Sequence, residues 1–350
     1  MKKKILIIQK SISFYNVPVF ELLANKYDLT LLHSDNACEE KKYPFKTIFV
    51  PCIRIRRNIH KRNIIKIANN FDVVICMFDL SYVYFRLLQR KKRKYRLIYW
   101  GIGVCASYTQ RFDSNQDVVK KNKRWIDNSD GALFYTEYAK SKYLKMGVDE
   151  KKLFVAPNTV AVNKIYPDNN RTCFLFVGSL YSAKKVDVLI KEFSCAKFVT
   201  KTIPHLIIVG DGNQKETLMS LSKELGLEDD VIFYGSITDE SELENLFRKS
   251  ILCVSPDQAG LSVLKSMGYG VCFVTSSNAF TGGERLNIQS GVNGILLESL
   301  DDLHSVLIDA SINKDKYLDI GNNAYKYYWD CRKIEDMEKG FVEAIEGGVQ

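Results

Sequence analysis

The chain has 350 residues, of which 46% are hydrophobic and 26% are charged. This length and balance are typical of a soluble globular protein with two domains, and they exclude a disordered chain. Residues 1–165 carry 32 Lys and Arg against 14 Asp and Glu, whereas the remainder carries 18 against 27. The two halves therefore have opposite net charge, and we expect them to meet different partners.

The N-terminal stretch MKKKILIIQK begins like a signal peptide, but its apolar run ends at Ile8, too early for a signal sequence. No window approaches the roughly 18 apolar residues that a membrane-spanning helix needs. The nine cysteines are scattered without a CxxC pair, so neither a zinc site nor a disulfide framework is expected. These features predict a cytoplasmic chain in a reducing compartment.

The first half alternates short apolar runs with amphipathic segments such as PVFELLANKY and EYAKSKYLKMG. The runs are KILIIQ, LTLLHS, TIFVPC, DVVICMF, RLIYWG, GALFYT and LFVAPN. This alternation predicts βαβ units around a parallel sheet, in one doubly wound domain.

The pattern restarts after a polar linker at residues 163–172, with the runs CFLFVG, HLIIVGDG, VIFYGS, ILCVSP, VCFVTS and GILLE. An aromatic-rich helix is then predicted from Asn322 to Ile345. We therefore expect an α/β fold with doubly wound domains at 1–163 and 164–321, and a segment 322–350 that returns to the first domain. Ligands of such sheets bind beyond the carboxyl ends of the strands, so two facing domains would enclose a central cleft.

Two dense basic runs lie in the first half, RKKRKYR (Arg90–Arg96) and RIRRNIHKR (Arg54–Arg62). A solvated face is the first interpretation, and an anionic membrane surface is the second. Nucleic acid is the weakest of the three because no recognisable nucleic-acid module accompanies the runs.

Three strand ends in the second half carry glycine turns. In VGSLYSAKKVDVLI the helix entry beside Lys184 suits a phosphate, although an exposed surface lysine is an equal alternative. The turn VGDGN lets a ligand approach the backbone or simply reverses the chain. In SPDQAGLSVLKSMGYG, Ser262 is predicted to cap a helix that runs to Tyr269. Lys265 would then lie in its first turn, either as a solvated lysine, the favoured interpretation, or beside a bound anion.

Taken together, these residues resemble the retaining glycosyltransferases of GT-B architecture with two Rossmann-like domains, and specifically family 4. In the second half the resemblance rests on FVGSLYSAKKVDVLI, IIVGDGN, VIFYGSI, ESELENLFRKS, CVSPDQAGLSVLKSMGYGVCFVTS and GVNGILLE. In the first half it rests on YNVPVFELLA, WGIG and ALFYTEYAKSKYLKMGVDEKKLFVAPNTV. These stretches follow the family's order and spacing over almost the whole chain.

The resemblance assigns roles to individual residues. Lys184 falls at the lysine that neutralises the donor diphosphate, and Asp257 falls at the first glutamate of the E-x7-E motif, which contacts the transferred sugar. Glu284 matches one acid of a motif that follows the next strand in a subset of the family, and Leu286 falls at another acid and does not match. Lys184, Asp257 and Glu284 are thus the expected catalytic residues. The expected donor-binding residues are Gly178, Ser179, Lys184, Gly210, Gly212, Gly235, Ser236, Ile237, Gly260, Leu261, Ser262 and Lys265.

Three positions depart from the family pattern. Lys265 falls at the second glutamate of E-x7-E, so carboxylate recognition of the donor ribose is not available there. Ser179 replaces an arginine that often binds the diphosphate, and Ile102 stands where family members commonly place a histidine. No DxD metal motif is evident, so neither a metal nor another cofactor is expected.

The resemblance implies a retaining, hexosyl-type transferase that moves a sugar from a nucleotide-sugar donor to a glycan or lipid-linked acceptor, in polysaccharide or glycoconjugate biosynthesis. Its expected place is the cytoplasm, with peripheral attachment at the inner face of the plasma membrane if the basic first domain binds anionic lipid. Two alternatives remain open. One is a catalytically degenerate GT-B protein that binds or regulates a partner, and the other is a nucleotide-sugar 2-epimerase.

Overall fold

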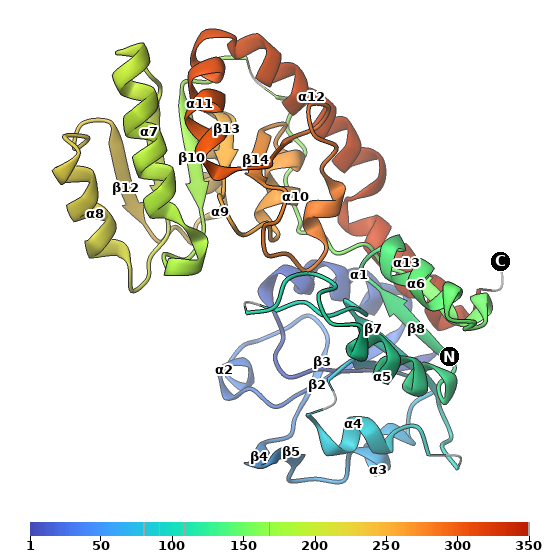
Figure 1. The fold of residues 1–350 in the computed structure, drawn as a ribbon. Coiled ribbons are helices and arrows are strands. Elements are labelled where there is room, and N and C mark those ends of the chain that lie inside the picture. The colour runs from blue at the N-terminus through green and yellow to red at the C-terminus, as the bar shows by residue number, and fades with distance from the viewer. Residues whose placement is uncertain (80, 91, 108, 168, 349–350) are drawn as a thin grey trace. The chain divides into compact units, whose positions relative to one another are not determined.

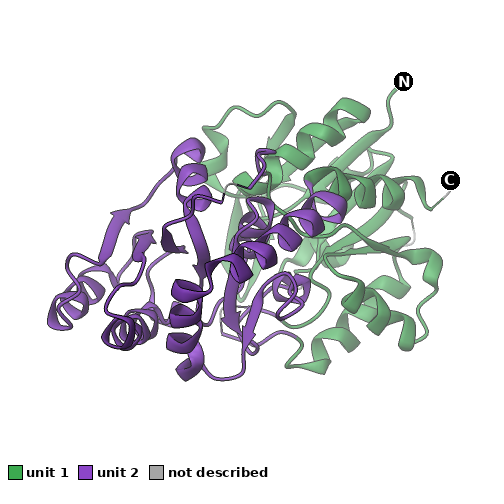
Figure 2. Ribbon diagram, turned by 90° about the horizontal axis from the view of Figure 1, so that it is seen from above, with its two compact units in different colours: residues 1–105, 113–161, 334–350 green, residues 106–112, 162–333 purple. Residues whose placement is uncertain are grey.

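The structure is a computed structural model that describes residues 1–79, 81–90, 92–107, 109–167 and 169–348. The chain forms two compact units (Figure 2). Unit 1 comprises residues 1–105, 113–161 and 334–350, and unit 2 comprises residues 106–112 and 162–333. No helix in these described ranges is both long enough and apolar enough to span a bilayer.

Unit 1 is built on a seven-stranded parallel sheet with the order β3-β2-β1-β6-β7-β8-β9 (Figure 1). Its strands are β1 (Lys4–Ile8), β2 (Asp28–His33), β3 (Lys46–Phe49), β6 (Val73–Met77), β7 (Arg96–Gly101), β8 (Gly131–Phe134) and β9 (Leu153–Val155). All seven apolar runs predicted in the first half form strands. The order reverses between β1 and β6, which is the topological switch point of a doubly wound sheet.

Helices cover both faces of this sheet because side chains alternate along each strand. The helices are α1 (Val17–Lys26), α2 (Asn36–Glu39), α3 (Ile64–Ala68), α4 (Val83–Leu87), α5 (Gln116–Asp127), α6 (Glu137–Lys145) and α13 (Ile334–Glu346). Ile5 and Ile7 of β1 join a core with α1 and α13. Leu6 and Ile8, which point the other way, join a second core with α3, α4 and α5.

A small antiparallel hairpin in unit 1 was not predicted. It consists of β4 (Cys52–Ile55) and β5 (Arg57–His60), joined at Arg56, whose φ is 62°. The hairpin lies between β3 and α3 in the chain and coincides with the basic run Arg54–Arg62.

Unit 2 contains a six-stranded parallel sheet with the order β12-β11-β10-β13-β14-β15. Its strands are β10 (Cys173–Val177), β11 (His205–Val209), β12 (Val231–Gly235), β13 (Ser250–Val254), β14 (Cys272–Ser276) and β15 (Ile295–Leu297). The helices are α7 (Val186–Thr200), α8 (Lys215–Glu224), α9 (Glu240–Arg248), α10 (Ser262–Gly268), α11 (Leu303–Ile312) and α12 (Lys314–Cys331). This sheet also reverses its order, between β10 and β13, so both units are doubly wound.

The single helix predicted from Asn322 to Ile345 is two helices, α12 and α13. At the break, Arg332 donates a hydrogen bond from Nη1 to the Cys331 carbonyl (2.7 Å) and another from Nε to Asn287 Oδ1 (2.6 Å). The Arg332 side chain thus satisfies a helix-terminal carbonyl that a continuing helix would have bonded. Residues 322–333 belong to unit 2, and only the segment from Ile334 onward belongs to unit 1.

The returning helix α13 packs closely on unit 1. A Cβ at Gly340 would lie 2.1 Å from the Val155 carbonyl oxygen, so only glycine permits this approach to β9. Phe341 of α13 lies with its ring centroid 5.0 Å from that of Trp100 in a T-shaped arrangement. The aromatic contact and the close backbone approach hold α13 as part of the unit 1 core.

Candidate functional site

The residues expected to act lie along one edge of the unit 2 sheet, because its strands are parallel and their carboxyl ends emerge together. The segment with Gly178 and Ser179 follows β10, and the segment with Asp257 follows β13. These two strands flank the switch point, where two neighbouring loops leave the sheet in opposite directions. The loops are joined by a hydrogen bond from the Tyr181 hydroxyl to Gln258 Oε1.

Lys184 ends a short 3-10 turn (Ser182–Lys184) between β10 and α7. Burial lowers the pKa of its ammonium to about 8, and no carboxylate of the described chain offsets this loss of hydration. The ammonium packs against the backbone, since a Cβ at Gly178 would lie 3.3 Å from Nζ. An exposed surface lysine, the alternative raised from the sequence, is therefore wrong. Lys184 is a desolvated cation that a bound anion would stabilise.

Asp257 is buried and holds two cations of unit 2. Arg111 donates to it through both terminal nitrogens, with Nη1–Oδ1 at 2.8 Å and Nη2–Oδ2 at 3.1 Å. Lys185 adds a third contact, with Nζ 3.2 Å from Oδ2. Such a bidentate pair fixes the carboxylate plane, so in this structure Asp257 is an oriented anion whose charge is already compensated.

Arg111 also lies flat against Phe280, with its guanidinium carbon 3.9 Å from the ring centroid, and donates to the Asn278 carbonyl. The stacking adds to the hydrogen bonds and holds the guanidinium in place. A ligand that uses the Asp257 carboxylate must therefore compete with Arg111.

The glycine turn after Asp257 presents unused backbone donors. The N–H groups of Gly260, Leu261 and Ser262 donate to no acceptor within the described ranges. Gly260 has nothing within 4 Å of a Cβ built on it, so neighbouring chain does not require glycine there. Absence of a side chain at that point leaves room for a ligand to approach the three N–H groups.

The predicted cap at Ser262 is wrong. Ser262 is the first residue of α10, Leu261 is the N-cap residue, and the cap makes no side-chain hydrogen bond. The helix ends at Gly268, with Tyr269 as its C-cap residue. Because no side chain caps this helix, the N–H groups at its start remain available to a ligand.

Lys265 is not the solvated lysine favoured from the sequence. Its residue is only 9% exposed, and its ammonium lies 2.5 Å from Glu240 Oε2, at the first position of α9. The Glu240 side chain is 58% exposed, so its carboxylate faces solvent on the side away from Lys265. The anion that offsets Lys265 is therefore a carboxylate of the chain itself.

Gly210 and Gly212 follow β11 and have a structural reason to be glycine. A Cβ at Gly210 would lie 1.9 Å from the Gly178 carbonyl oxygen, and one at Gly212 would lie 2.3 Å from the Leu180 carbonyl oxygen. Close packing of the two loops thus requires both glycines without any ligand. The β12 turn lies beside them, because Gly235 accepts a 2.7 Å bond from the Gly210 N–H, while Ser236 is exposed and Ile237 half-buried.

Glu284 is buried in the loop after β14. Its carboxylate accepts hydrogen bonds from the Thr281 hydroxyl (3.0 Å) and the Gly282 N–H (2.7 Å). Leu286, at the position of a missing acid, is exposed. Glu284 therefore stabilises its own turn, which follows β14, the neighbour in the sheet of β13, the strand that precedes Asp257.

Sequence reasoning missed Arg111 and Glu240, and it noted Lys185 only beside Lys184 at the helix entry, without its contact to Asp257. Lys185 was visible as the second lysine of a pair, but its left-handed backbone (φ 52°), which turns it toward Asp257, has no local signal. Arg111 and Glu240 lie far in sequence from their partners, so only the folded chain brings them together.

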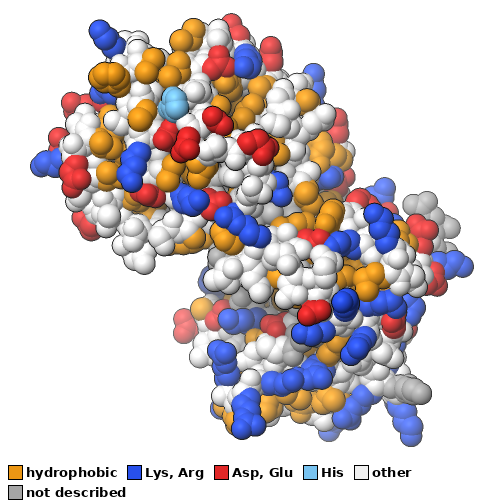
Figure 3. All heavy atoms as spheres, viewed as in Figure 1, with side chains coloured by type: hydrophobic (Ala, Val, Ile, Leu, Met, Phe, Trp, Pro, Cys, Tyr) orange, Lys and Arg blue, Asp and Glu red, His pale blue; other side chains and the backbone are white. Residues whose placement is uncertain are grey.

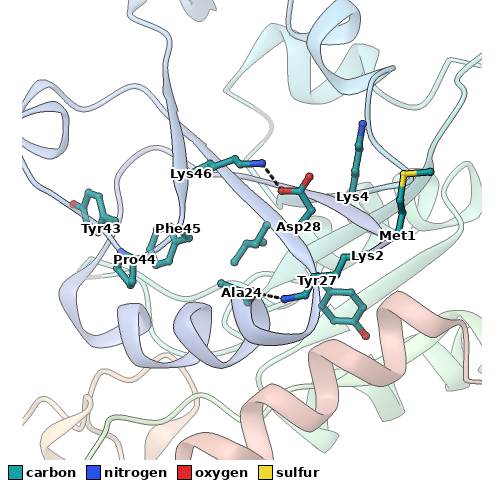
Figure 4. Close-up of a pocket in the computed structure, with 11 residues that line it drawn as sticks. Met1, Lys2, Lys4, Ala24, Tyr27, Asp28, Tyr43, Pro44, Phe45 and Lys46 are labelled. Atoms are coloured by element: carbon teal, nitrogen blue, oxygen red, sulfur yellow. Dashed lines mark hydrogen bonds and ion pairs between the residues drawn. The ribbon is translucent and has the colours of Figure 1, made fainter.

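Unit 1 carries a hollow of about 630 Å³ at the amino-terminal edge of its sheet, where Lys4, Asp28 and Lys46 begin β1, β2 and β3 (Figure 4). Lys46 pairs with Asp28 at 2.7 Å, and Lys2 donates to the Asn25 carbonyl at 2.6 Å. Its cations are thus largely engaged, and the hollow lies at the opposite edge from the strand ends that usually bind ligands. At the switch point of this sheet, by contrast, the buried amide nitrogen of Gln9 has no hydrogen-bond partner within the described residues.

The sequence is similar to those of known glycosyltransferases. Residues 160–327 match the family model described as "Glycosyl transferases group 1". The chain is 25% identical to the lipopolysaccharide 1,6-galactosyltransferase of Salmonella typhimurium over 287 residues, which span 79% of this chain and 76% of that relative. It is 29% identical to the N-acetyl-alpha-D-glucosaminyl L-malate synthase of Bacillus anthracis over 152 residues, 43% of this chain and only 38% of that protein.

Solved structures share the fold over the whole length. The Anabaena protein Alr3699/HepE in complex with UDP matches with a TM-score of 0.74 at 14% identity, covering 98% of this chain and 99% of that one. The lipopolysaccharide outer core galactosyltransferase WaaB in its apo form matches with a TM-score of 0.70 at 20% identity, covering 99% and 100%. The chain thus has the GT-B fold, with two Rossmann-like units. The segment that matches the group 1 glycosyltransferase model lies almost wholly in unit 2.

Proposed function

We propose that this protein is a retaining, hexosyl-type glycosyltransferase of family 4 that takes its sugar from a nucleotide-sugar donor. Unit 2 binds the donor and unit 1 binds the acceptor, a glycan or a lipid-linked glycan in polysaccharide or glycoconjugate biosynthesis. One structural neighbour, Alr3699/HepE, has been solved in complex with UDP and with UDP-glucose, which supports a nucleotide-sugar donor for this chain too. The alternatives of a regulatory GT-B protein and a 2-epimerase gain no support from relatives that are named as transferases and a synthase.

The observation that carries the proposal is the uncompensated cation at the switch point. Lys184 is desolvated and has no carboxylate partner among the described residues. At the end of the neighbouring strand, the N–H groups of Gly260, Leu261 and Ser262 donate to no acceptor in the described ranges. A diphosphate between them would accept hydrogen bonds from the turn and restore the full charge of Lys184. The missing arginine at Ser179 leaves this lysine as the principal cation for the diphosphate.

The proposed reaction separates charge. The bond between the anomeric carbon and the diphosphate oxygen breaks, and the acceptor oxygen forms a bond on the same face of the sugar. The acceptor proton passes to the departing diphosphate, whose negative charge is held by Lys184 and the turn. Asp257 contacts the sugar once the donor has displaced Arg111, and Glu284 keeps the loop after β14 in place beside it.

We infer that the ion pair of Lys265 and Glu240 recognises the donor ribose. Lys265 stands where the family places a carboxylate, but it holds Glu240 at 2.5 Å with the acid exposed to solvent. We assign ribose binding to the outer oxygen of Glu240, with Lys265 as its positioning residue. Unit 1 supplies the acceptor site near Gln9, whose buried amide nitrogen is available to an acceptor hydroxyl.

The test is a thermal-shift panel of UDP, GDP, dTDP, CDP and ADP with the wild type, Lys184→Met and a control. Lys191→Met is the matched control, because Lys191 lies on α7, the helix that follows the Lys184 turn, and its ammonium pairs with Asp187 on the surface. A nucleotide at about 100 times its Kd stabilises the fold by roughly 2.7 kcal/mol. We expect one nucleotide to raise Tm in the wild type and the control but not in Lys184→Met. No shift with any nucleotide at millimolar concentration would overturn the donor site.

A further inference from the structure

The β4–β5 hairpin turns an apolar face away from unit 1. In its antiparallel register Ile53 lies opposite Ile59, and Ile55 lies opposite Arg57, so these four side chains share one face. The other face holds His60, which is buried against the rings of Tyr82 and Phe85. Because that face binds the core, the isoleucine face points outward, with Ile53 46% and Ile55 65% exposed.

Cations surround these isoleucines and lack acidic partners. The hairpin and its end carry the exposed residues Arg54, Arg56, Arg57, Lys61 and Arg62. None of them forms an ion pair in the described part of unit 1. Natural sheets do use edge lysines and arginines to prevent aggregation, but that device does not call for exposed isoleucines between them.

A hollow of about 810 Å³ continues from the hairpin along α4 and α5. It is lined by Arg57, Val83, Arg86, Leu87, Gln89, Lys121, Arg124, Trp125 and Asn128, a set with four cations and no acid. The Arg86 guanidinium lies 5.7 Å from the centroid of the Trp125 ring. The hollow thus has an apolar floor and a cationic rim, and Arg57 belongs to both the hollow and the outward face of the hairpin.

Helix α5 shows that this lack of acids is local. Lys123 pairs with Asp127 at 2.8 Å, and Lys120 lies 3.8 Å from Asp117, both within the helix. Lys121 and Arg124, which line the hollow, have no such partner among the described residues. The same helix therefore compensates its cations elsewhere and leaves two uncompensated at the hollow.

The other basic run, Arg90–Arg96, does not form a comparable surface. Arg93 is bound to Asp130 at 2.8 Å, Tyr95 is buried, and Lys91 lies outside the described residues. In Figure 3 blue and orange side chains predominate over the end of unit 1 that carries β4, β5 and α4. The run Arg90–Arg96 is denser in basic residues, but the exposed isoleucines and the cations without acidic partners lie together at the β4–β5 hairpin.

We propose that the hairpin–hollow surface, made by Ile53, Ile55, Arg57, Arg86, Lys121 and Arg124, docks unit 1 on an anionic phospholipid bilayer. The isoleucines enter the boundary between head groups and acyl chains, and the cations of the hollow bind head-group phosphates. A bilayer fits better than nucleic acid, which offers phosphates and stacking bases but no apolar phase for aliphatic side chains. The proposal locates the membrane attachment expected from charge, and it does not rest on the transfer chemistry.

The experiment measures co-sedimentation with vesicles, without nucleotide, using phosphatidylcholine alone and phosphatidylcholine mixed with phosphatidylglycerol. The hollow variant is Arg86→Gln, Lys121→Gln, Arg124→Gln, and the hairpin variant is Ile53→Ser, Ile55→Ser. The matched control is Arg90→Gln, Lys92→Gln, Lys94→Gln, which removes three exposed cations from the same unit. Circular dichroism and Tm establish that each variant folds.

We expect the wild type to bind anionic but not neutral vesicles at low salt. The hollow variant should lose on the order of 100-fold in partition, from about fivefold for each cation removed. The control should lose much less, and the hairpin variant should lose the part of the binding that persists when salt screens the cations. Equal losses in the hollow variant and the control, or no binding by the wild type, would overturn the proposal, as would preferential binding of RNA over anionic vesicles.

A second reporter tests insertion directly. Ile55→Trp places an indole on the outward face, and quenching by brominated lipids is expected if the hairpin enters the bilayer; an unquenched indole on bound protein would exclude insertion. The hollow variant should keep the nucleotide-dependent Tm shift of the wild type. Loss of vesicle binding with that shift intact separates failure of the docking surface from failure of the proposed donor site.

Discussion

The cations of the unit 2 site and those of the hairpin–hollow surface in unit 1 differ in what faces them. In unit 2, Arg111 and Lys185 meet Asp257, and Lys265 meets Glu240. In unit 1, Arg86, Lys121 and Arg124 meet no acid in the described residues. Compensated cations hold side chains in fixed positions, whereas uncompensated ones on a surface attract an extended anionic partner. Lys184 is the exception in unit 2, and it is there that we place a small anion.

The largest expected effect tests this exception. Lys184→Met removes the proposed diphosphate cation while keeping an apolar stem of similar length. We expect kcat/KM to fall by about 10²–10³, the loss typical of one charge-stabilising donor. The assay uses the nucleotide sugar whose nucleotide raises Tm, with Lys191→Met as the control. Transfer at the wild-type rate in Lys184→Met would show that the cation is structural.

The second prediction concerns the ion pair of Lys265 and Glu240, in which each partner is replaced in turn. Glu240→Gln leaves Lys265 buried without its carboxylate, so we expect the free energy of unfolding to fall by about 2 kcal/mol, less than for a fully buried pair because Glu240 is half exposed. Lys265→Met removes the buried charge itself and should cost less than about 1 kcal/mol. Urea denaturation measures both.

The order of these two losses is the decisive result. If Lys265→Met destabilises more than Glu240→Gln, the pair contributes net stability of its own and is not a positioning device. The proposed ribose role has a separate readout. Glu240→Gln should weaken binding of the ribonucleoside diphosphate but hardly affect the 2′,3′-dideoxy analogue, since only the former has hydroxyls to donate.

The third prediction uses the pKa of Lys184, which is about 8 in the free protein. Below pH 8 the ammonium is already charged, so a diphosphate binds without taking up a proton. Above pH 8 the free lysine is neutral, and binding must restore its proton. Affinity should therefore fall about tenfold between pH 7 and pH 9.

Calorimetry in buffers of different ionisation enthalpy measures this linkage. We expect close to one proton taken up per diphosphate at pH 9 and almost none at pH 7. The Lys184→Met protein, in whatever binding it retains, should take up none. Equal proton uptake at both pH values would show that Lys184 is not the linked group.

The smallest expected effect belongs to unit 1. Burial lowers the pKa of His60 from 6.5 to about 4, so the native protein binds fewer protons there than the unfolded chain between these values. The contribution of neutral His60 to the free energy of unfolding is thus fully present above pH 6.5 and is lost as the pH falls toward 4. Between pH 7 and pH 5.5 the loss is about 1 kcal/mol.

His60→Phe should flatten that part of the pH dependence, because the ring still stacks on Tyr82 and Phe85 but no longer titrates. Urea unfolding of both proteins at pH 7 and pH 5.5 gives the comparison. His304→Phe is the control, since His304 lies half-exposed beside Glu192 in unit 2. An unchanged slope in His60→Phe would mean that His60 is hydrated in solution.

The sequence was most informative where periodicity was strong. Every apolar run assigned to a strand forms one, because a buried parallel strand needs apolar side chains on both faces. The hairpin was missed because the run Arg54–Arg62 was read only as charge, although Ile53 and Ile55 alternate with Cys52 and Arg54 as in a strand. The break between α12 and α13 has no glycine or proline to announce it.

The site was predictable only in part. The glycines and Lys184 follow strand ends, and parallel topology places them at one edge. The state of Lys265 depends on Glu240, 25 residues earlier, and that of Asp257 depends on Arg111, 146 residues earlier. Such partners carry no local signal, so a sequence can indicate which charges are available but not which are already neutralised.

The membership of α13 in unit 1 has a consequence for synthesis of the chain. Met337, Phe341 and Ala344 belong to the same core as the strand β1, so that core stays incomplete on the ribosome until the residues of α13 have emerged. Unit 2, apart from the short segment 106–112, is finished by residue 333. Unit 1 is therefore translated first but completed last, and the apolar residues that α13 covers stay exposed until that helix has been synthesised. Chaperone dependence and sensitivity to truncation should concentrate in unit 1.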